Sequence, residues 1–188
     1  MDEAILRSIN RWAEAPAIAL FAQALSSRWM LVLVAAPLLV VHLLARRYLL
    51  IASVVLAVGV SDLLASRVIK PLADRERPCR ALTELEVPVD CGSGRSFPSV
   101  HAANAFGLAV AAGIETPHGL VILLPIAALV SLSRIVLGQH WPSDVLGGAL
   151  LGAILGLAAT LARRRIGPGR GPGPGRGPAS GRGPGSGG

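Results

Sequence analysis

Polar residues gather at three points of an otherwise apolar chain, and the third point holds the residue types of nucleophilic catalysis. This third cluster begins at Ser133 and Arg134 and contains His140 and Asp144. Pro142 is typical of a first helical turn, so we expect His140 just before a helix and Asp144 within its first turn. A carboxylate beside one imidazole nitrogen fixes the tautomer and leaves the other nitrogen able to attack an electrophile. His140 is therefore a candidate nucleophile, with Asp144 as its partner.

The second cluster, residues 96–101, directly precedes the apolar run Ala102–Ile114. Pro98 followed by Ser99 predicts that a helix begins here, with its unpaired N–H groups and positive dipole end open to an anion. Ser99 adds a hydroxyl donor, and His101 lies in the first turn. This pattern is typical of a phosphate-binding helix end. The alternative is a capping serine beside an interfacial histidine without a chemical role.

The first cluster places two cations, Lys70 and Arg77, seven residues apart. On a continuous helix this spacing returns to the same face, and Pro78 predicts that the helix ends at Arg77. Lys70 is the sole lysine of the chain, and its compact ammonium is suited to hold a phosphate oxygen as a point charge. The alternative is that both cations are snorkelling anchors at a helix end.

The composition favours a bilayer over water as the solvent of the elements that carry these clusters. Hydrophobic residues make up 52% of the 188 residues, charged residues 15%, and the mean hydropathy is +0.59. These values are too apolar for an ordinary soluble domain. Five windows without a formal charge approach the roughly 17–25 residues that a spanning helix needs. They are Trp29–Ala45, Tyr48–Ser61, Ser96–Ile114, Thr116–Ser133 and Val145–Ala162.

The sequence therefore predicts an all-α, polytopic membrane bundle of five or six transmembrane helices. The second window is short, and it extends toward Ile69 if Asp62 and Arg67 face the bundle interior, where intramembrane charges usually lie. Residues 4–27 are expected to form an amphipathic helix that is interfacial or re-entrant. If that segment instead crosses the membrane, it supplies the sixth span. The expected units are then 1–28, a membrane domain at 29–162 and a tail at 163–188.

The net charge of +7 comes mostly from the tail, where six arginines are interspersed with Gly, Pro and Ser. This composition predicts a disordered segment, because it offers too little apolar surface to offset the ordering entropy. We therefore expect a solvated cytoplasmic tail and no nucleic-acid partner. Weak attraction to anionic lipid or RNA is the alternative.

The placement of positive charge predicts which face carries the three clusters. Arg46–Arg47 follows the first window and Arg163–Arg165 the last, so the positive-inside rule puts both on the cytoplasmic side. Counting crossings then puts the segments Lys70–Arg95 and Gly138–Ser143 together on the extracytoplasmic face. The chemistry is expected there.

Two cysteines, Cys79 and Cys91, fall in the predicted extracytoplasmic segment. Oxidation is permitted on that side of the membrane, which makes a disulfide between them possible in chemical terms. Sequence spacing does not establish the geometry, so a disulfide and two free thiols both stay open.

Taken together, the clusters carry K-x(6)-R-P from Lys70, P-S-x-H from Pro98 and S-R-x(5)-H-x(3)-D from Ser133. Their order and spacing resemble the signature of the type-2 phosphatidic acid phosphatase superfamily, which includes undecaprenyl-diphosphate phosphatases and the soluble vanadium haloperoxidases. The resemblance covers roughly Tyr48–Ala162. Val100 departs from it, since the commonest form of the second motif has glycine there, and this puts substrate preference and rate in doubt.

The resemblance implies that His140 attacks phosphorus to form a phosphohistidine, that Asp144 orients it and that His101 protonates the leaving oxygen. Cations and N–H donors are implied to hold the equatorial oxygens, where charge accumulates during transfer. These substrate-binding residues are Lys70, Arg77, Ser99, Val100, His101 and Arg134, with the backbone acting at Val100 and His101. Neither a metal nor another cofactor is implied, because protein cations replace the usual magnesium clamp.

The implied substrate is a lipid phosphate at the bilayer surface of the cell (inner) membrane, and the likeness favours undecaprenyl diphosphate. Phosphatidic acid, phosphatidylglycerophosphate and lipid A phosphates are the alternatives within this class. A membrane scaffold or channel with polar helix ends is the alternative of another class, and it leaves the motif spacing unexplained.

Overall fold

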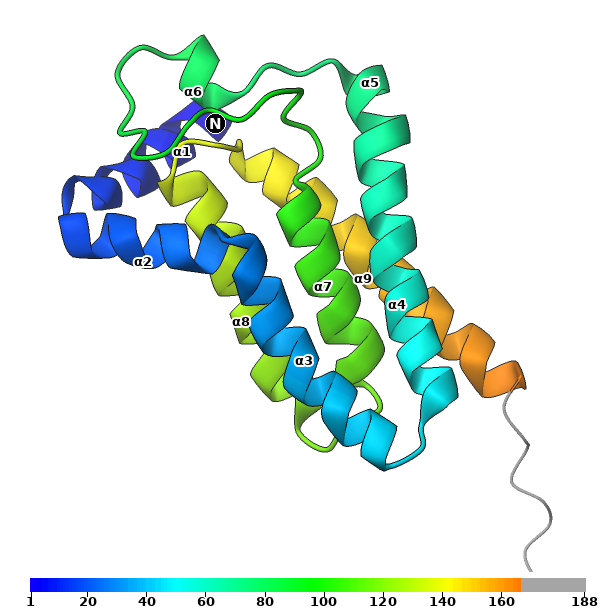
Figure 1. Ribbon diagram of the computed structural model, residues 1–188. Helices are drawn as coiled ribbons and strands as arrows, with labels where there is room; N and C mark the ends of the chain where they lie inside the picture. Colours follow the sequence, from blue (N-terminus) through cyan, green and yellow to red (C-terminus); the bar gives the residue numbers. More distant parts are fainter. Residues whose placement is uncertain (167–188) are drawn as a thin grey trace, which may run out of the picture.

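The computed structural model describes residues 1–166, which fold as a bundle of helices (Figure 1). Every regular element in this part of the chain is a helix, which confirms the all-α prediction. In chain order the elements are α1 Asp2–Asn10, the 3-10 turn η1 Arg11–Glu14, α2 Pro16–Ser26, α3 Arg28–Leu44, α4 Tyr48–Leu63, the π-helical turn η2 Leu64–Ile69, α5 Lys70–Ala73, α6 Pro78–Ala81, α7 Val100–Gly113, α8 Gly119–Val136 and α9 Pro142–Ile166.

Several of these helices match a membrane in length and apolarity. The stretches Tyr48–Ala81, Gly119–Val136 and Pro142–Ile166 each qualify as a membrane span by these criteria. Pro16–Ser26 and Trp29–Leu44 meet at a bend of 53° and supply a fourth span if they are counted together. Within residues 1–166, length and composition therefore support three or four spans, and five or six stays a prediction.

The helix after Tyr48 continues beyond its uncharged window, as predicted, but its two charges are not buried, although Asp62 lines the cavity between α3, α7 and α8. Asp62 and Arg67 are exposed, and Ser61 and Ala65, four residues apart, take the buried positions of this helix instead. Small side chains let α4 approach its neighbours closely, which leaves no room for a longer charged group on that face. Asp62 accepts a hydrogen bond from Asn104 of α7 at 3.0 Å.

The prediction that one helix runs from Lys70 to Arg77 is wrong. The chain leaves helical geometry after Ala73, because Asp74 adopts a left-handed conformation with φ of 44°. Arg77 is extended, as residues before proline prefer, and Pro78 occupies the first turn of α6. Proline here starts a helix and does not end one. A loop, not a shared helical face, therefore relates Lys70 to Arg77.

Helices α7 and α9 pack closely, and glycines make that approach possible. A Cβ atom added at Gly148 would overlap the Ser99 carbonyl, and one added at Gly152 would overlap the Ala103 carbonyl. Gly156 continues the same row, one turn further along α9. A stripe of small residues at this spacing lets two helix backbones come together, and here it does so within one chain.

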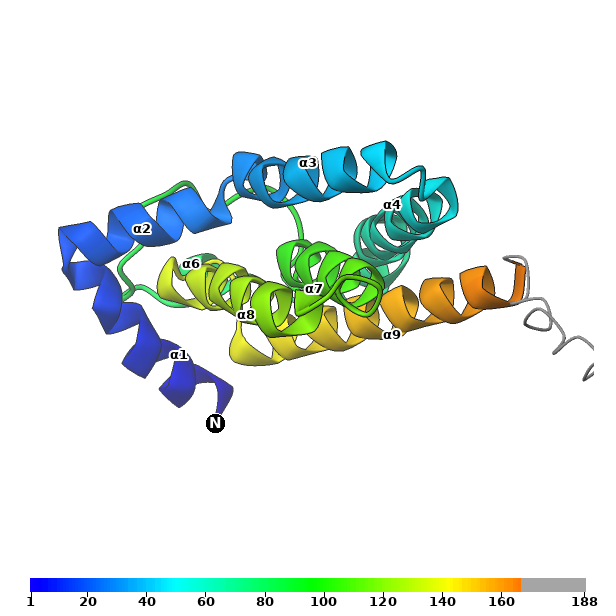
Figure 2. The same cartoon turned by 90° about the horizontal axis from the view of Figure 1, so that it is seen from below.

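The amino-terminal segment folds as two α-helices joined by η1, whereas its sequence predicted one. Both lie outside the group formed by α7, α8 and α9 (Figure 2). Asn10, buried at the end of α1, donates from Nδ2 to the carbonyls of Glu86 and Val136, both at 2.8 Å. Its Oδ1 accepts from Glu86 N at 2.9 Å. One side chain thus attaches α1 to α8 and to the long loop before α7.

The carboxyl-terminal boundary differs from the predicted unit at 163–188. Helix α9 runs to Ile166, so the arginines at its end belong to the helix. Arg163 and Arg164 contact Glu115 at 2.6 and 2.8 Å, which ties them to the turn between α7 and α8. Residues 167–188, which hold the rest of the predicted tail, lie outside the described part of the chain.

Substitution of Gly152 by valine should destabilise the bundle by about 3 kcal/mol or more, because the new side chain meets backbone atoms of α7. The matched control is Gly59→Ala, since a Cβ at Gly59 in α4 meets no atom within 4 Å. We expect thermal unfolding in detergent to show a large drop for Gly152→Val and none for Gly59→Ala. Equal midpoints for the two variants would contradict the packing.

Candidate active site

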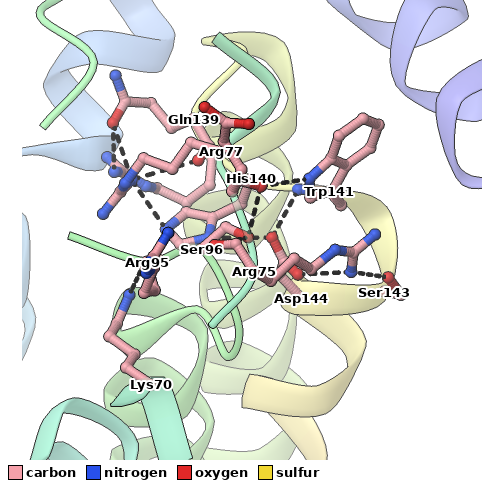
Figure 3. Close-up of polar contacts among 12 residues, drawn as sticks. Lys70, Arg75, Arg77, Arg95, Ser96, Gln139, His140, Trp141, Ser143 and Asp144 are labelled. Carbon is pink, nitrogen blue, oxygen red and sulfur yellow. Dashed lines mark hydrogen bonds and ion pairs between the residues drawn. The ribbon is translucent and has the colours of Figure 1, made fainter. Parts of the chain in front are cut away.

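The three polar clusters converge at one end of the bundle, where the α5–α6 loop, the start of α7 and the α8–α9 turn meet (Figure 1). The backbone N–H of Ser99 donates to the carbonyl of Asp144 at 3.0 Å, which joins the second cluster to the third. Lys70 Nζ donates to the carbonyl of Arg95 at 2.5 Å and so turns toward the same loop (Figure 3). Helix ends distant in the sequence therefore build one site.

His140 lies at the centre of this end and is only 2% exposed. It follows Gly138, whose φ of 65° lets the chain reverse after α8. One imidazole nitrogen, Nδ1, lies 3.5 Å from Oδ2 of Asp144. The other, Nε2, lies 3.5 Å from Nη1 of Arg77 (Figure 3). The ring is thus held between a carboxylate and a guanidinium, with Nε2 on the cationic side.

Two buried guanidinium groups line that cationic side. Arg77 and Arg134 are each 8% exposed. Both donate to Oε1 of Gln139, at 3.3 and 3.2 Å, and Arg77 also donates to the Gln139 carbonyl at 3.2 Å. Arg134 further contacts the hydroxyl of Ser26 at the end of α2. The arginines therefore sit side by side and aim at a common point, where an anion with several oxygens would accept from both.

The amino-terminal end of α7 closes another side of the site. Ser99 is the N-cap of α7, is fully buried, and its Oγ has no hydrogen-bond partner among residues 1–166. Buried hydroxyls are seldom left unpaired, so this donor is suited to an anion bound at the helix end. His101, in the first turn of the helix, interacts with the backbone of Ser26.

Val100 and His101 also line a cavity of about 240 Å³ beneath the site. Most of its wall is apolar and comes from α3, α7 and α8, including Met30, Leu31 and Leu108. A phosphate held at the helix ends would thus have an apolar space directly beside it.

A disulfide between Cys79 and Cys91, with Cα atoms 5.9 Å apart, closes the loop that follows α6. The backbone N–H of Cys79 donates to the carbonyl of Gly138 at 3.1 Å. Arg80, inside the closed loop, donates to the carbonyl of Gly92, which directly follows the crosslink, at 2.7 Å. The crosslinked loop therefore rests on the turn that presents His140.

Sequence reasoning missed three residues that structure this end of the bundle. Gln139 joins the two guanidinium groups, and Arg75 and Asp2 contact the residues around Asp144. Arg75 lies between Lys70 and Arg77 and was visible as a further cation in the first cluster. Gln139 and Asp2 carried no signal in the sequence. Among residues 1–166, no three His, Cys, Asp or Glu side chains gather in a way that would hold a metal ion.

Comparison with known proteins identifies the family. The sequence profile of the PAP2 superfamily matches residues 47–168, which is more than half of the chain. The chain belongs to the PAP2 superfamily. This confirms the resemblance drawn from the three motifs, all of which lie inside the matched range.

Solved and curated relatives of this PAP2 protein extend the comparison. The crystal structure of Aquifex aeolicus LpxE has a TM-score of 0.69 at 28% identity and covers 84% of this chain and 93% of that one. A decaprenylphosphoryl-5-phosphoribose phosphatase of Mycobacterium tuberculosis is 43% identical over 90 residues, 47% of this chain and 48% of the relative. A lipid A 4'-phosphatase of Bacteroides thetaiotaomicron is 32% identical over 113 residues, 56% and 50% of the two chains.

The chain spans about half the length of the curated relatives it matches. The structural likeness, by contrast, covers 93% of Aquifex aeolicus LpxE. This likeness and the long apolar helices mark this PAP2 protein as an integral membrane protein. The relatives named here act on different lipid phosphates.

The imidazole of His140 is held in its neutral form by its surroundings. Burial lowers its pKa to about 3, and the nearby charges of Arg134 and Arg77 act in the same direction. The hydrogen bond and negative charge of Asp144 act in the opposite direction without cancelling them. A neutral imidazole keeps a lone pair, which a nucleophile requires.

This low pKa predicts that acid destabilises the fold through His140. Below pH 6.5 the unfolded chain protonates this residue while the folded chain does not, so the free energy of unfolding falls as the pH drops toward 3. The loss should reach about 2 kcal/mol at pH 5. His140→Asn should remove this loss, which is measured as a smaller shift in unfolding midpoint between pH 7 and pH 5.

The matched control is His118→Asn, because His118 is exposed at the opposite end and sits in a left-handed conformation that asparagine tolerates. That variant should keep the full acid sensitivity of the original chain. Identical pH responses in His140→Asn and His118→Asn would show that the buried imidazole does not carry the effect.

Proposed function

We propose that this PAP2 protein is a metal-independent lipid phosphatase that works through a phosphohistidine on His140. The observation that carries the proposal is the setting of its imidazole, buried between Asp144 on Nδ1 and Arg77 on Nε2. A neutral imidazole whose second nitrogen faces a cationic pocket is arranged for attack on a phosphorus atom held by those cations.

In the first step, Nε2 of His140 attacks phosphorus, the new N–P bond forms and the ester O–P bond breaks. Asp144 accepts from Nδ1–H and stabilises the positive charge that develops on the ring. His101 donates a proton to the leaving oxygen. Cations and N–H donors hold the three equatorial oxygens, as befits a transition state in which charge spreads over them. The proposed holding groups are Lys70, Arg77, Ser99, Arg134 and the backbone at Val100 and His101.

In the second step, water attacks the phosphohistidine and the N–P bond breaks. His101, which became neutral in the first step, now acts as the general base and accepts a proton from that water. Inorganic phosphate leaves and Nε2 regains its lone pair. The cationic groups act in both steps because both pass through the same distribution of negative charge.

The proposed substrate is a membrane lipid that carries a terminal phosphate or diphosphate. The apolar cavity beside Val100 and His101 would take the part of the lipid next to the phosphate. Undecaprenyl diphosphate remains our first expectation, and the polyprenyl-linked substrate in the name of the mycobacterial relative belongs to the same class of lipid. The lipid A relative keeps lipid A phosphates as an alternative, beside phosphatidic acid and phosphatidylglycerophosphate.

We further propose five crossings, made by α3, α4 with its extension, α7, α8 and α9. Arg46–Arg47 and Arg163–Arg165 lie at the end opposite to the site, and the positive-inside rule favours the cytoplasm for them. The site then faces the extracytoplasmic side, with α1 and α2 at that interface. A channel or scaffold would not require a buried histidine set between a carboxylate and a guanidinium, so we favour the enzyme.

Purified protein should release inorganic phosphate from at least one of these lipid phosphates in the presence of EDTA, because the proposed clamp consists of protein cations. The panel contains undecaprenyl diphosphate, a polyprenyl-linked sugar phosphate, phosphatidic acid, phosphatidylglycerophosphate and lipid A. Phosphate release is measured alongside thermal unfolding, to establish that the protein is folded. Folded protein that hydrolyses none of the lipids would count against the enzyme.

A lipid labelled in its terminal phosphate should transfer the label to the protein, and His140→Ala should abolish that transfer. The reaction is quenched in alkaline detergent, since a phosphoramidate survives alkali and is lost in acid. His118→Ala, at the exposed histidine of the opposite end, is the matched control and should label normally. Normal labelling of His140→Ala would rule out this nucleophile.

A further inference from the structure

Arg75 makes contacts that the proposed reaction does not use. Its Nη1 donates to Oδ1 of Asp144 at 2.7 Å and to the hydroxyl of Ser143 at 2.6 Å (Figure 3). Its Nη2 donates to Oδ2 of Asp2 at 2.6 Å. The guanidinium also lies over the ring of Trp141, 5.1 Å from the ring centre. Four neighbours therefore restrain one side chain, which lies between the amino-terminal residue Asp2 and the carboxylate of the site.

Asp2 also contacts the first turn of α9 directly. Its Oδ1 accepts from the backbone N–H of Ser143 at 3.0 Å, and its Oδ2 contacts the Ser143 hydroxyl. Asp2 belongs to α1, whereas Ser143 stands in the first turn of α9. Hydrogen bonds from Ser143 and Arg75 outweigh the opposing effect of burial and lower the pKa of Asp2. Asp2 is thus an anion that caps the first turn of α9 and at the same time binds the guanidinium of Arg75.

These contacts determine the orientation of Asp144. Its carboxylate is fully buried, so each oxygen needs a partner. Oδ1 accepts from Arg75, while Oδ2 accepts from the backbone N–H of Trp141 at 2.9 Å and faces Nδ1 of His140. If Arg75 moved, Oδ1 would lose its donor, and the carboxylate would be able to rotate away from the imidazole.

We infer that Asp2 and Arg75 are positioning residues, which act through Asp144 to keep His140 oriented. The inference rests on the proposed function for its kinetic consequence, though the geometry of the imidazole is measurable without it. Ordinary surface ion pairs contribute little because both partners move freely in water. Here Arg75 also bonds a fully buried carboxylate, and Asp2 of α1 holds the other nitrogen of the same guanidinium.

The kinetic test compares two neighbouring acidic residues of α1. Asp2→Asn should lower kcat about tenfold with less than a twofold change in KM, because phosphate binding does not involve Asp2 but the aim of the nucleophile does. Glu3→Gln is the matched control, since Glu3 pairs with Arg7 at 2.8 Å on the exposed side of α1. It should leave kcat unchanged. Equal kcat values for the two variants would overturn the inference.

Variants of Arg75 separate positioning from charge. Arg75→Gln should lower kcat about 100-fold. Arg75→Lys keeps the charge but cannot bridge three acceptors, so it should recover little of this loss. Adding Asp2→Asn to Arg75→Gln should cost nothing more, because both act through one contact. The acid limb of the pH–rate profile should move to higher pH in Arg75→Gln, since losing a cation beside Asp144 favours the imidazolium.

A readout without substrate keeps this inference separate from the proposed function. Nitrogen NMR of the histidine rings in detergent should show His140 as one tautomer, protonated on Nδ1, in the original chain and in Glu3→Gln. Asp2→Asn and Arg75→Gln should show a mixture of tautomers. If no lipid in the hydrolysis panel were hydrolysed but these NMR changes were present, the phosphatase proposal would be contradicted and the positioning role would be supported. An unchanged tautomer in both variants would overturn the positioning role, whatever the activity.

Discussion

The close approach of α9 to α7 is the contact on which the rest of the site depends. Because Gly148 and Gly152 have no Cβ atom, the two helices meet backbone to backbone. The consequence at their ends is a hydrogen bond from Ser99 N–H to the Asp144 carbonyl, so the two helix starts lie side by side. Both starts carry the positive end of a helix dipole, which makes their junction favourable for an anion.

That junction also explains why a carboxylate belongs there. Asp144 lies in the first turn of α9, where a negative charge is stabilised by the dipole. It is surrounded by Arg75 and by the backbone N–H of Trp141, and His140 approaches its remaining side. The same carboxylate therefore caps its own helix and orients the imidazole. A change in helix packing would disturb both roles together.

The sequence predicts those features of the structure that depend on short, continuous stretches of residues. Hydropathy windows located α3, α8 and α9 within a few residues, and the family followed from motif spacing, because both depend on short stretches of sequence. The prediction of one helix from Lys70 to Arg77 was wrong, since Asp74 takes a left-handed conformation and its carboxylate pairs with Arg95, which lies in a later loop.

The partners of the missed residues are distant in sequence. Asp2 meets Ser143 across 141 positions, and Arg75 meets Asp144 across 69. Gln139 accepts from Arg77, which lies 62 residues earlier in the chain. No periodicity or short motif encodes such pairs, because the pairing arises only when the helix ends are assembled. The spacing of the motifs therefore predicts which side chains reach the site, but not which neighbours hold them in place.

The two buried arginines impose the strongest electrostatic demand on this assembly. Arg77 and Arg134 repel one another, and the acceptor they share, Oε1 of Gln139, carries only a partial charge. A neutral amide offsets part of the desolvation of two guanidiniums, whereas a phosphate with two negative charges would offset much more. The fold keeps these cations in place without a ligand, through the turn at Gly138 and the contact of Arg134 with Ser26 of α2. An anion bound there would therefore meet cations that are already in place when the helices pack, and their effect would be greatest on the species in which phosphoryl oxygens carry the most charge.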